Sequence, residues 1–565
     1  MGQLGRKPIG GVSHVLGDTK APLWHLTIPQ LLAQTAGKFP DHEAAVFTAQ
    51  NIRWSYRELT KQVDAVAQGL LDLGLTKGDR VGIWSPNRIE WLLVQFATAR
   101  IGAILVCINP SYRLSELEYA LNKVGCHTLV MAASFKSSNY VAMMAELTPE
   151  MYAPQTKSTV FSRLPDLRNI VVLQDEPPIG THSFNSLKKC PNAVQRSALD
   201  HLSNTLSSED PINIQFTSGT TGNPKGACLT HHNIINNARF VTDAMTFTST
   251  DRLCIPVPFY HCFGMVMGTL GCVTKGAAIV VPGEGFDARA TLNAVSQERC
   301  TALFGVPTMF VNELDLPDFA DFDLSALRTG IMAGAPCPIE VMRAVQSKMN
   351  MAGVTIAYGM TETSPVSFQS NVDDPIEQRV SSVGRIHPHV EVKIVDENGT
   401  TVPIGAQGEL LTRGYSVMQG YWGESVQTQD CIDENDWMHT GDLATLDAEG
   451  YCAITGRLKD MILRGGENVY PREIEEFLYT HPDVSQVQVF GIPDHTLGEV
   501  VCAWIVPRTG TVLSAQDIST FCRKNIAHYK VPLHIAFKSE LPMTVTGKPQ
   551  KFVMRDQMLA ELSTD

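Results

Sequence analysis

The segment TSGTTGNPKG, residues 217–226, concentrates groups that bind phosphate. It contains three glycines, four hydroxyl side chains and one lysine. Glycines let a backbone approach phosphate oxygens closely, hydroxyl and N–H groups donate hydrogen bonds to them, and lysine adds a mobile positive charge. The segment therefore predicts a phosphate-binding loop, although a surface turn without a ligand can have a similar composition.

The spacing and flanks of this loop exclude a Walker loop. Lys225 follows Pro224 and precedes Gly226, whereas a Walker loop needs Gly-Lys-Ser/Thr leading directly into a helix. The flanking segments alternate like two strands, and Thr230 can cap a helix that follows the second strand. We therefore expect the tip of a hairpin, with Asn223-Pro224 as its turn.

Five further motifs follow the loop in a fixed order. They are YGMTE (358–362), GEL…RG (408–414), TGD (440–442), GRLKDMILRGGENVYP (456–471) and PMTVTGK (542–548). The ordered set resembles the adenylate-forming superfamily of acyl-CoA synthetases, luciferases and peptide-synthetase adenylation domains. The stretches PINIQFTSGTTG, YHCFG, PTMFV, SVGRI and GYWGE are similar to its fatty acyl-CoA synthetase branch.

The resemblance implies a site for ATP and Mg²⁺. Its phosphate-binding residues would be Thr217, Ser218, Gly219, Thr220, Thr221, Gly222, Asn223, Pro224, Lys225 and Gly226. The adenine and its slot would be lined by Tyr358, Gly359, Thr361, Gly334, Ala335 and Pro336. Asp442 would accept the ribose hydroxyls with Arg457 nearby, and Thr220 with Glu362 would hold Mg²⁺, a hard ion that prefers oxygen ligands.

The same resemblance implies a catalytic lysine and a moving C-terminal domain. Lys548 would reach the α-phosphate and the substrate carboxylate, cancel the repulsion between these anions and stabilise the transition state. Lys459 would be the hinge about which the domain turns between two half-reactions. The co-substrate CoA would pass through a tunnel flanked by Arg464, Gly465 and Gly466.

The identity of the acid is a separate expectation. Acetate-using members of the superfamily carry a tryptophan where this chain has Gly359, so we expect a deeper apolar pocket here. Its candidate walls are His261, Phe263 and Val306, together with Gly334 and Gly359. A medium-chain fatty acid is the first expectation, and a short branched, hydroxy or keto acid is the alternative.

Composition and charge exclude several other classes. The formal net charge of -13 argues against a general nucleic-acid binder, which needs clustered positive charge. The 13 scattered cysteines show no zinc-type spacing, and together with the lack of a visible address at the N-terminus they favour a cytoplasmic location. No stretch predicts a transmembrane segment. Only a short segment follows Lys548, so we expect no carrier domain of the peptide-synthetase kind.

A nucleotide-binding scaffold without turnover is the alternative from another class. Glu362, Asp442, Arg457 and Lys548 occur together, and that combination favours an enzyme. A luciferase-type oxygenase shares the motifs, although the chain ends in LSTD and not in a peroxisomal SKL address.

The elements that must position these residues alternate between strand-like and helical patterns over about the first 450 residues. We expect a large α/β domain over residues 1–457. After the polar run GRLKD (456–460), a helix, two strands, a second helix and a short strand predict a compact α+β domain over residues 458–565. The expected fold is thus a large N-terminal α/β domain of the adenylate-forming type with a small mobile C-terminal domain.

Overall fold

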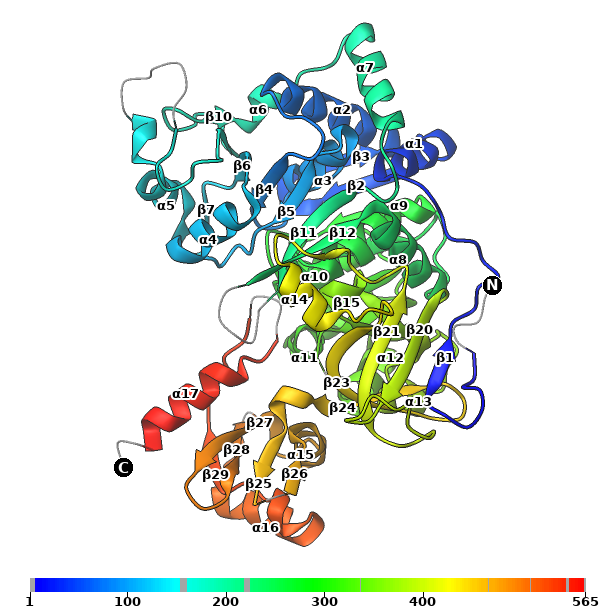
Figure 1. Cartoon of the computed structure of the whole chain (residues 1–565), viewed down its shortest axis with the longest axis vertical. Coiled ribbons are helices and arrows are strands. Elements are labelled where there is room, and N and C mark those ends of the chain that lie inside the picture. The colour runs from blue at the N-terminus through cyan, green and yellow to red at the C-terminus, as the bar shows by residue number, and fades with distance from the viewer. Residues whose placement is uncertain are drawn as a thin grey trace.

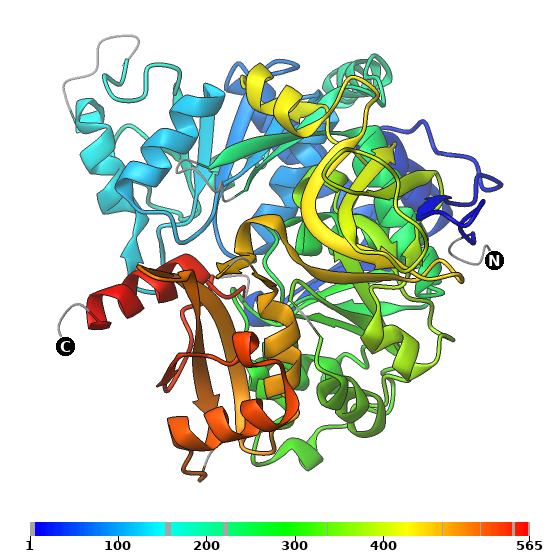
Figure 2. The ribbon, with the colours of Figure 1, turned by 60° about the horizontal axis from the view of Figure 1, so that its bottom comes forward.

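The computed structural model describes residues 6–152, 160–217, 224–335, 337–465, 467–508, 510–544 and 548–562. Within these residues the chain forms two large sheets, two sheets of five strands each and one short hairpin. The fourth sheet and its helices, which come from the C-terminal part, lie at the end of the large body below β23 and β24 (Figure 1). In Figure 2 this part, drawn in orange and red, lies against one face of the large body.

The two large sheets are mostly parallel. In the described residues the first has eight strands in the order β10 (His182–Ser183), β9 (Asn169–Val172), β6 (Thr128–Met131), β4 (Arg80–Trp84), β5 (Ile104–Cys107), β11 (Pro211–Thr217), β12 (Lys225–Thr230) and β22 (Gly420–Tyr421). The second has nine, in the order β19 (Arg385–Ile386), β18 (Val366–Gln369), β17 (Gly353–Gly359), β16 (Thr329–Ala333), β15 (Ala302–Gly305), β13 (Arg252–Cys254), β14 (Ala278–Val281), β2 (Glu43–Phe47) and β3 (Ile52–Ser55).

The largest hydrophobic core joins these two sheets through helices. It contains Val81 of the first sheet, Ile279 of the second, and most of α3, which is apolar on all sides. A helix of that composition is stable only when it is buried all round. The helices of the large body are α1 (Ile28–Lys38), α2 (Tyr56–Asp72), α3 (Ile89–Ile101), α4 (Leu114–Val124), α5 (Tyr140–Leu147), α6 (Phe184–Leu187), α7 (Ala193–Asn204), α8 (His231–Ala244), η3 (Phe263–Leu270), α9 (Gly271–Lys275), α10 (Ala288–Gln297), α11 (Pro307–Leu314), α12 (Ile339–Lys348), α13 (Ile376–Ser381) and α14 (Ser425–Cys431).

The third sheet is antiparallel and carries two of the predicted site residues. Its strands follow the order β1 (His14–Leu16), β20 (Val390–Val395), β21 (Gly408–Gly414), β23 (Met438–Leu446) and β24 (Cys452–Arg457). On β23 and β24, Asp442 and Arg457 are directly opposite each other in the register. Facing residues in adjacent antiparallel strands lie close enough for their side chains to interact.

The C-terminal part forms the fourth sheet, with helices on both of its faces. The strands are β26 (Glu467–Val469), β25 (Ile462–Arg464), β28 (Gly498–Pro507), β27 (Val484–Asp494) and β29 (His534–Phe537), and the helices are α15 (Pro471–Leu478), α16 (Ala515–Asn525) and α17 (Lys551–Leu562). One core contains Val487 and Ile518, and the other contains Trp504 and Met554. Residues after Lys548 therefore cover a second face of the sheet.

The predicted fold class is confirmed, and several local predictions match the structure. The hairpin β11–β12 is antiparallel, Thr230 caps α8 by accepting from Asn233 N, and Pro471 begins α15. The predicted domain limits, 1–457 and 458–565, stay a prediction. In the structure, β24 of the third sheet ends at Arg457 and β25 of the fourth sheet begins at Ile462. No helix among the described residues is long and apolar enough to cross a membrane.

Two histidines buried in the large body predict an acid-sensitive fold. His231 Nδ1 accepts from Ile28 N at 3.1 Å, and His387 Nε2 lies 3.0 Å from Gln369 Oε1. Neither is exposed, and burial lowers the pKa of each from 6.5 to about 3. Above pH 6.5 neither the folded nor the unfolded chain protonates them. Below pH 6.5 only the unfolded chain does, so each histidine costs about 1.4 kcal/mol of stability per pH unit down to about pH 3.

The measurement is denaturant unfolding of the wild type and of His387→Gln at about pH 7.5 and about pH 5. The variant starts less stable because it changes a packed site, but it loses less stability than the wild type on acidification. An equal loss in both proteins would contradict the assignment.

Candidate active site

The phosphate loop joins two paired strands of the first sheet. Thr217 ends β11, Lys225 begins β12, and the two residues are partners in the register. The ammonium of Lys225 lies 4.8 Å from the ring centroid of Tyr421, which is on the neighbouring strand β22. Residues 218–223 lie outside the described residues, and so do Pro336 and Gly466. The structure thus shows both ends of the predicted loop at one edge of the site.

Glu362 lies where the first two large sheets meet. It belongs to the short helix η5 (Thr361–Thr363), which follows β17, and it is 5% exposed. Its Oε1 accepts hydrogen bonds from Thr217 Oγ1 at 3.2 Å and from Tyr421 Oη at 2.9 Å. A buried carboxylate is stable when charge-assisted hydrogen bonds of this kind compensate for lost water. These bonds hold a negative charge beside the end of the phosphate loop.

Tyr421 is a site residue that the sequence motifs did not assign. Burial and the neighbouring Glu362 carboxylate raise the pKa of its phenol well above the ordinary value, so the hydroxyl remains a donor at physiological pH. The tyrosine is the second letter of the GYWGE stretch, which was noted only for its resemblance to one branch. The resemblance of that stretch was the one signal in the sequence that pointed to Tyr421. Nothing in the neighbouring residues indicates a contact with Glu362.

Asp442 connects the second and third sheets. Its Oδ2 accepts from Tyr358 Oη at 2.6 Å, and its Oδ1 accepts from Arg457 Nε at 2.9 Å. Burial, together with the Asp442 carboxylate, raises the pKa of Tyr358 well above its ordinary value. The carboxylate side chain is 8% exposed whereas that of Arg457 is 53% exposed, so one side of this group faces solvent. Three residues predicted to contact the nucleoside are therefore brought together.

Lys548, in the C-terminal part, is close enough to these two carboxylates for its charge to interact with both. Its backbone N donates to Thr544 Oγ1 at 2.9 Å, and Thr544 N donates to the carbonyl oxygen of Lys548 at 2.8 Å. The lysine keeps exposed surface, yet many protein atoms surround it, and this desolvation, followed by the charge of Arg457, lowers the pKa of its ammonium. Glu362 and Asp442 act in the opposite direction. Lys548 is thus within electrostatic range of both acidic residues.

Two of the predicted acyl-pocket residues, His261 and Phe263, lie just before η3 and at its first residue. Burial lowers the pKa of His261 to about 3, and the charge of Lys548 contributes to this. His261 is therefore neutral at physiological pH. Phe263 packs against Phe304 with ring centroids 5.2 Å apart. Phe263 and Phe304 both belong to the largest hydrophobic core, and His261 is within electrostatic range of Lys548.

The predicted glycines fit tightly into the ends of the second sheet. Gly334 has φ +89°, and a Cβ there would lie 3.2 Å from Val306 Cγ1, so Gly334 and Val306 are neighbours. Ala335 follows Gly334 beyond the end of β16. A Cβ at Gly359 would lie 1.8 Å from the carbonyl oxygen of Pro365. The main chain itself therefore requires glycine at position 359, whatever the size of the acyl group.

The predicted hinge and CoA residues lie farther along the chain. Lys459 is exposed in the short helix η6 (Leu458–Asp460), directly after β24. Arg464 Nη1 donates to the carbonyl oxygen of Tyr529 at 2.5 Å, within the C-terminal part. Gly465 has φ +59°, a left-handed conformation that favours glycine. In this arrangement the side-chain hydrogen bonds of Arg464 stay within the C-terminal part.

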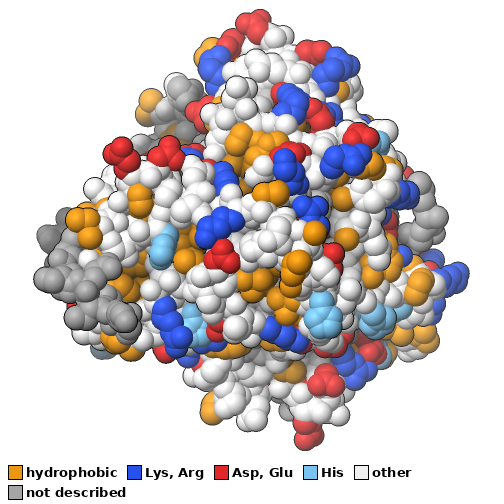
Figure 3. All heavy atoms as spheres, turned by 90° about the horizontal axis from the view of Figure 1, so that it is seen from above, with side chains coloured by type: hydrophobic (Ala, Val, Ile, Leu, Met, Phe, Trp, Pro, Cys, Tyr) orange, Lys and Arg blue, Asp and Glu red, His pale blue; other side chains and the backbone are white. Residues whose placement is uncertain are grey.

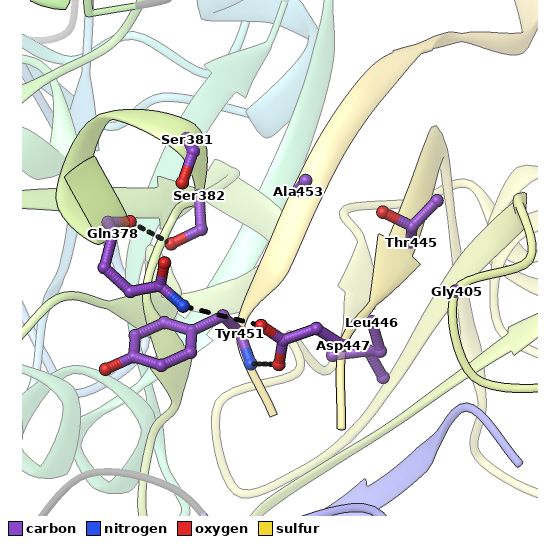
Figure 4. A pocket seen from close by; sticks show the side chains of 9 residues that line it. All are labelled: Gln378, Ser381, Ser382, Gly405, Thr445, Leu446, Asp447, Tyr451 and Ala453. Carbon is purple, nitrogen blue, oxygen red and sulfur yellow. Dashed lines mark hydrogen bonds between the residues drawn. The ribbon is translucent and has the colours of Figure 1, made fainter. Parts of the chain in front are cut away.

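A separate small pocket lies at the other end of β23. It has a volume of about 120 Å³ and is lined by Gln378, Ser381, Ser382, Gly405, Thr445, Leu446, Asp447, Tyr451 and Ala453 (Figure 4). Its polar groups bind one another: Tyr451 N donates to Asp447 Oδ1 at 2.9 Å, and Gln378 Nε2 lies 3.5 Å from Asp447 Oδ2. None of the predicted site residues lines it.

The face drawn in Figure 3 carries charges of both signs. On that face the Lys and Arg side chains drawn in blue are interspersed with Asp and Glu in red and with hydrophobic groups. A backbone-binding surface for nucleic acid would instead gather positive charge along one stripe.

Comparisons with known proteins agree with the geometry. The AMP-binding enzyme family matches residues 32–422, and the AMP-binding enzyme C-terminal domain matches residues 473–548. The chain is 46% identical to the medium-chain acyl-CoA ligase ACSF2, mitochondrial, of Danio rerio, over 97% of this chain and 91% of that protein. It is 44% identical to the Homo sapiens protein of the same name, over 98% and 91%.

Solved structures are similar along nearly the whole chain. The anthranilate CoA ligase AuaEII in complex with anthranoyl-AMP matches with a TM-score of 0.81 and 26% identity, covering 95% of this chain and 98% of that one. ATP-bound MatB from Rhodopseudomonas palustris matches with a TM-score of 0.77 and 28% identity, covering 94% and 99%. The sequence motifs, the clustered site and these matches lead to one conclusion: the chain belongs to the AMP-binding enzyme family.

Proposed function

We propose that this chain is an AMP-forming acyl-CoA synthetase whose preferred acid is a medium-chain fatty acid. The observation that carries the proposal is a pair of hydrogen-bonded carboxylates, Glu362 bonded to Thr217 and Asp442 bonded to Tyr358 and Arg457, both within electrostatic range of Lys548. A cation in this position can bring two anions, ATP and a carboxylate, into contact. The vertebrate relatives that are 44–46% identical are medium-chain acyl-CoA ligases by name, which supports the choice of acid.

In the first half-reaction a carboxylate oxygen of the acid attacks the α-phosphorus of ATP. The bond to the bridging oxygen breaks, and acyl-AMP and pyrophosphate form. Lys225 and the loop that it closes hold the leaving phosphates, Asp442 accepts hydrogen bonds from the ribose, and the ammonium of Lys548 stabilises the charge that gathers at the α-phosphate. In the second half-reaction the CoA thiol, losing its proton, attacks the acyl carbonyl and AMP leaves.

The described part of the metal site suits a hard cation. Glu362 is a buried carboxylate next to the loop and donates oxygen ligands, the kind that Mg²⁺ prefers. Together with Thr220 and the phosphate oxygens it would hold Mg²⁺, which neutralises phosphate charge when bound. Thr217 and Tyr421 orient the carboxylate, since both donate to its Oε1.

The experiment uses purified protein with ATP, Mg²⁺ and CoA, and a panel of straight acids from about C2 to C16 plus branched, hydroxy, keto and aromatic acids. Each further buried methylene contributes about 0.8 kcal/mol, so turnover should rise with chain length up to the pocket limit. Mass spectrometry identifies the acyl-CoA. A maximum at a branched, hydroxy or keto acid would favour the alternative substrate, and no turnover with any acid would favour a nucleotide-binding scaffold.

We also propose that the protein is located in the cytoplasm. This location is supported by the scattered cysteines, none of which is paired in a disulfide among the described residues. The vertebrate relatives are named mitochondrial, so the two compartments need a direct comparison. Fractionation of cells from the native host with an antibody to the chain would decide between them.

A further inference from the structure

Two histidines and a glutamate meet away from the ATP site. They are His25, which precedes α1, Glu209, which precedes β11, and His232 in the first turn of α8. One donor atom from each lies within 4.8 Å of the other two. The imidazole rings are stacked with centroids 4.9 Å apart, and His232 Nδ1 is 3.7 Å from Glu209 Oε1. Three segments distant in sequence thus direct ligand-type atoms to one point.

Main-chain hydrogen bonds hold the three segments together. Trp24, next to His25, donates its N–H to Asn236 Oδ1 at 2.7 Å and accepts from Asn236 Nδ2 at 2.9 Å. His232 N donates to the carbonyl oxygen of Ser208 at 2.8 Å. The carbonyl of Glu209 accepts from Gln419 Nε2 at 3.0 Å. The backbones that carry the three side chains are therefore fixed relative to one another before any ligand binds.

The donor set determines which ligand would suit this cluster. Two imidazole nitrogens and one carboxylate oxygen match borderline transition-metal ions, whereas Mg²⁺ and Ca²⁺ prefer oxygen ligands alone. His232 is 8% exposed, whereas His25 and Glu209 are exposed to solvent. A metal ion can therefore reach the cluster from solution.

The cluster is separate from the site of chemistry. β11 ends at Thr217 and β12 starts at Lys225, both beside the phosphate loop. Glu209 precedes the start of β11 and His232 follows the end of β12, so both lie at the opposite end of the hairpin. The strands between span roughly 20 Å at 3.4 Å per residue.

We propose that His25, Glu209 and His232 form a binding site for a divalent transition-metal ion, with Zn²⁺ as the best match. The ion would cross-link the segment before α1 to the start of α8 and to the chain that enters β11. It leaves one coordination position for water. Its effect is on the stability of this corner of the large body, and it takes no part in binding ATP.

The test is isothermal titration of ZnCl₂ into the full-length chain, freed of metal with a chelator and carrying Cys190→Ser to remove the exposed thiol. His25→Asn and Glu209→Gln change exposed side chains and should fold normally. We expect one site in the parent protein and a loss of affinity of about tenfold or more in each variant, the scale on which even outer ligand partners matter. The matched control is His14→Asn, because His14 pairs with a single carboxylate, Glu391, at 2.7 Å and should not change Zn²⁺ affinity.

A second readout uses Co²⁺ in place of Zn²⁺. Visible d–d absorption should develop on titration of the parent protein, should be lost in His25→Asn, and should withstand excess Mg²⁺. The proposal is overturned if the parent protein binds no Zn²⁺, if the two variants bind it as tightly as the parent, or if Mg²⁺ displaces Co²⁺ at similar concentrations.

Discussion

Replacing Lys548 by alanine should lower the rate of acyl-AMP formation about 100- to 1,000-fold, the range found when a group that stabilises transition-state charge is removed. The ammonium is within electrostatic range of Glu362, Asp442 and Arg457. Without it, the α-phosphate and the substrate carboxylate would repel each other. Formation of acyl-CoA from supplied acyl-AMP should stay near the wild-type rate. Pyrophosphate release measures the first half-reaction, and mass spectrometry of acyl-CoA measures the second.

The control for this variant is Lys189→Ala. Lys189 forms a surface ion pair with Asp72 at 2.9 Å, and such pairs contribute little to stability. This variant should retain both half-reactions. An equal loss of both half-reactions in Lys548→Ala would contradict the role assigned to Lys548, because the lysine would then serve folding or nucleotide binding in general.

The pH dependence of adenylation gives a further check on the same residue. Desolvation and Arg457 lower the pKa of Lys548 from 10.5, so the free enzyme loses the required positive charge at a pH below that value. The rate at low ATP should therefore fall on the alkaline side earlier than an ordinary lysine would allow. In Lys548→Arg the residual activity should persist to higher pH, since arginine stays charged. Identical alkaline limbs in both proteins would assign the fall to another group.

Glu362→Gln should have the second largest effect, a decrease in acyl-AMP formation of about 100-fold. The substitution removes a buried charge that accepts hydrogen bonds from Thr217 and Tyr421, and bonds to charged groups contribute about 1.5–3 kcal/mol each. It also removes the proposed ligand of Mg²⁺. Raising the Mg²⁺ concentration should restore part of the activity, measured as exchange of labelled pyrophosphate into ATP.

Tyr421→Phe is the matched variant for Glu362→Gln. It keeps the carboxylate and the ring over which Lys225 lies, and it removes only the hydroxyl that donates to Glu362. We expect a decrease of about tenfold, the value of one hydrogen bond to a charged acceptor. A larger loss in Tyr421→Phe than in Glu362→Gln would show that the tyrosine acts on the substrate and not through the carboxylate.

The sequence predicted those turns and helix starts that are determined by a few neighbouring residues. The hairpin at 217–225 followed from alternation and turn residues, and the start of α8 followed from Thr230 as a cap. The helix α17 was not anticipated, because its buried side chains are Met554 and Met558 alone while Phe552 is 64% exposed. Its apolar positions therefore lack the regular stripe that identifies a helix.

The site residues with a motif of their own were also predicted, whereas those that depend on long-range contacts were missed. The motifs named Tyr358, Asp442 and Glu362, and the structure brings them together from two sheets and the helix between strands. Tyr421 was missed because its contact with Glu362 depends on the pairing of β22 with β12, which no local pattern indicates. The sequence also did not reveal why position 359 is glycine. In the structure a Cβ there would collide with the main chain of Pro365.

The order of Asp442, Arg457 and Lys459 along β23, β24 and η6 has a consequence for the fate of the intermediate. Asp442 and Arg457 precede the predicted pivot at Lys459, and they pair within the third sheet of the large body. In the predicted rotation about Lys459 the side chains that would hold the ribose would stay with the large body, whereas Lys548 would move with the C-terminal domain. We therefore expect acyl-AMP to be retained between its formation and its capture by CoA, so that a reactive mixed anhydride is seldom lost to water.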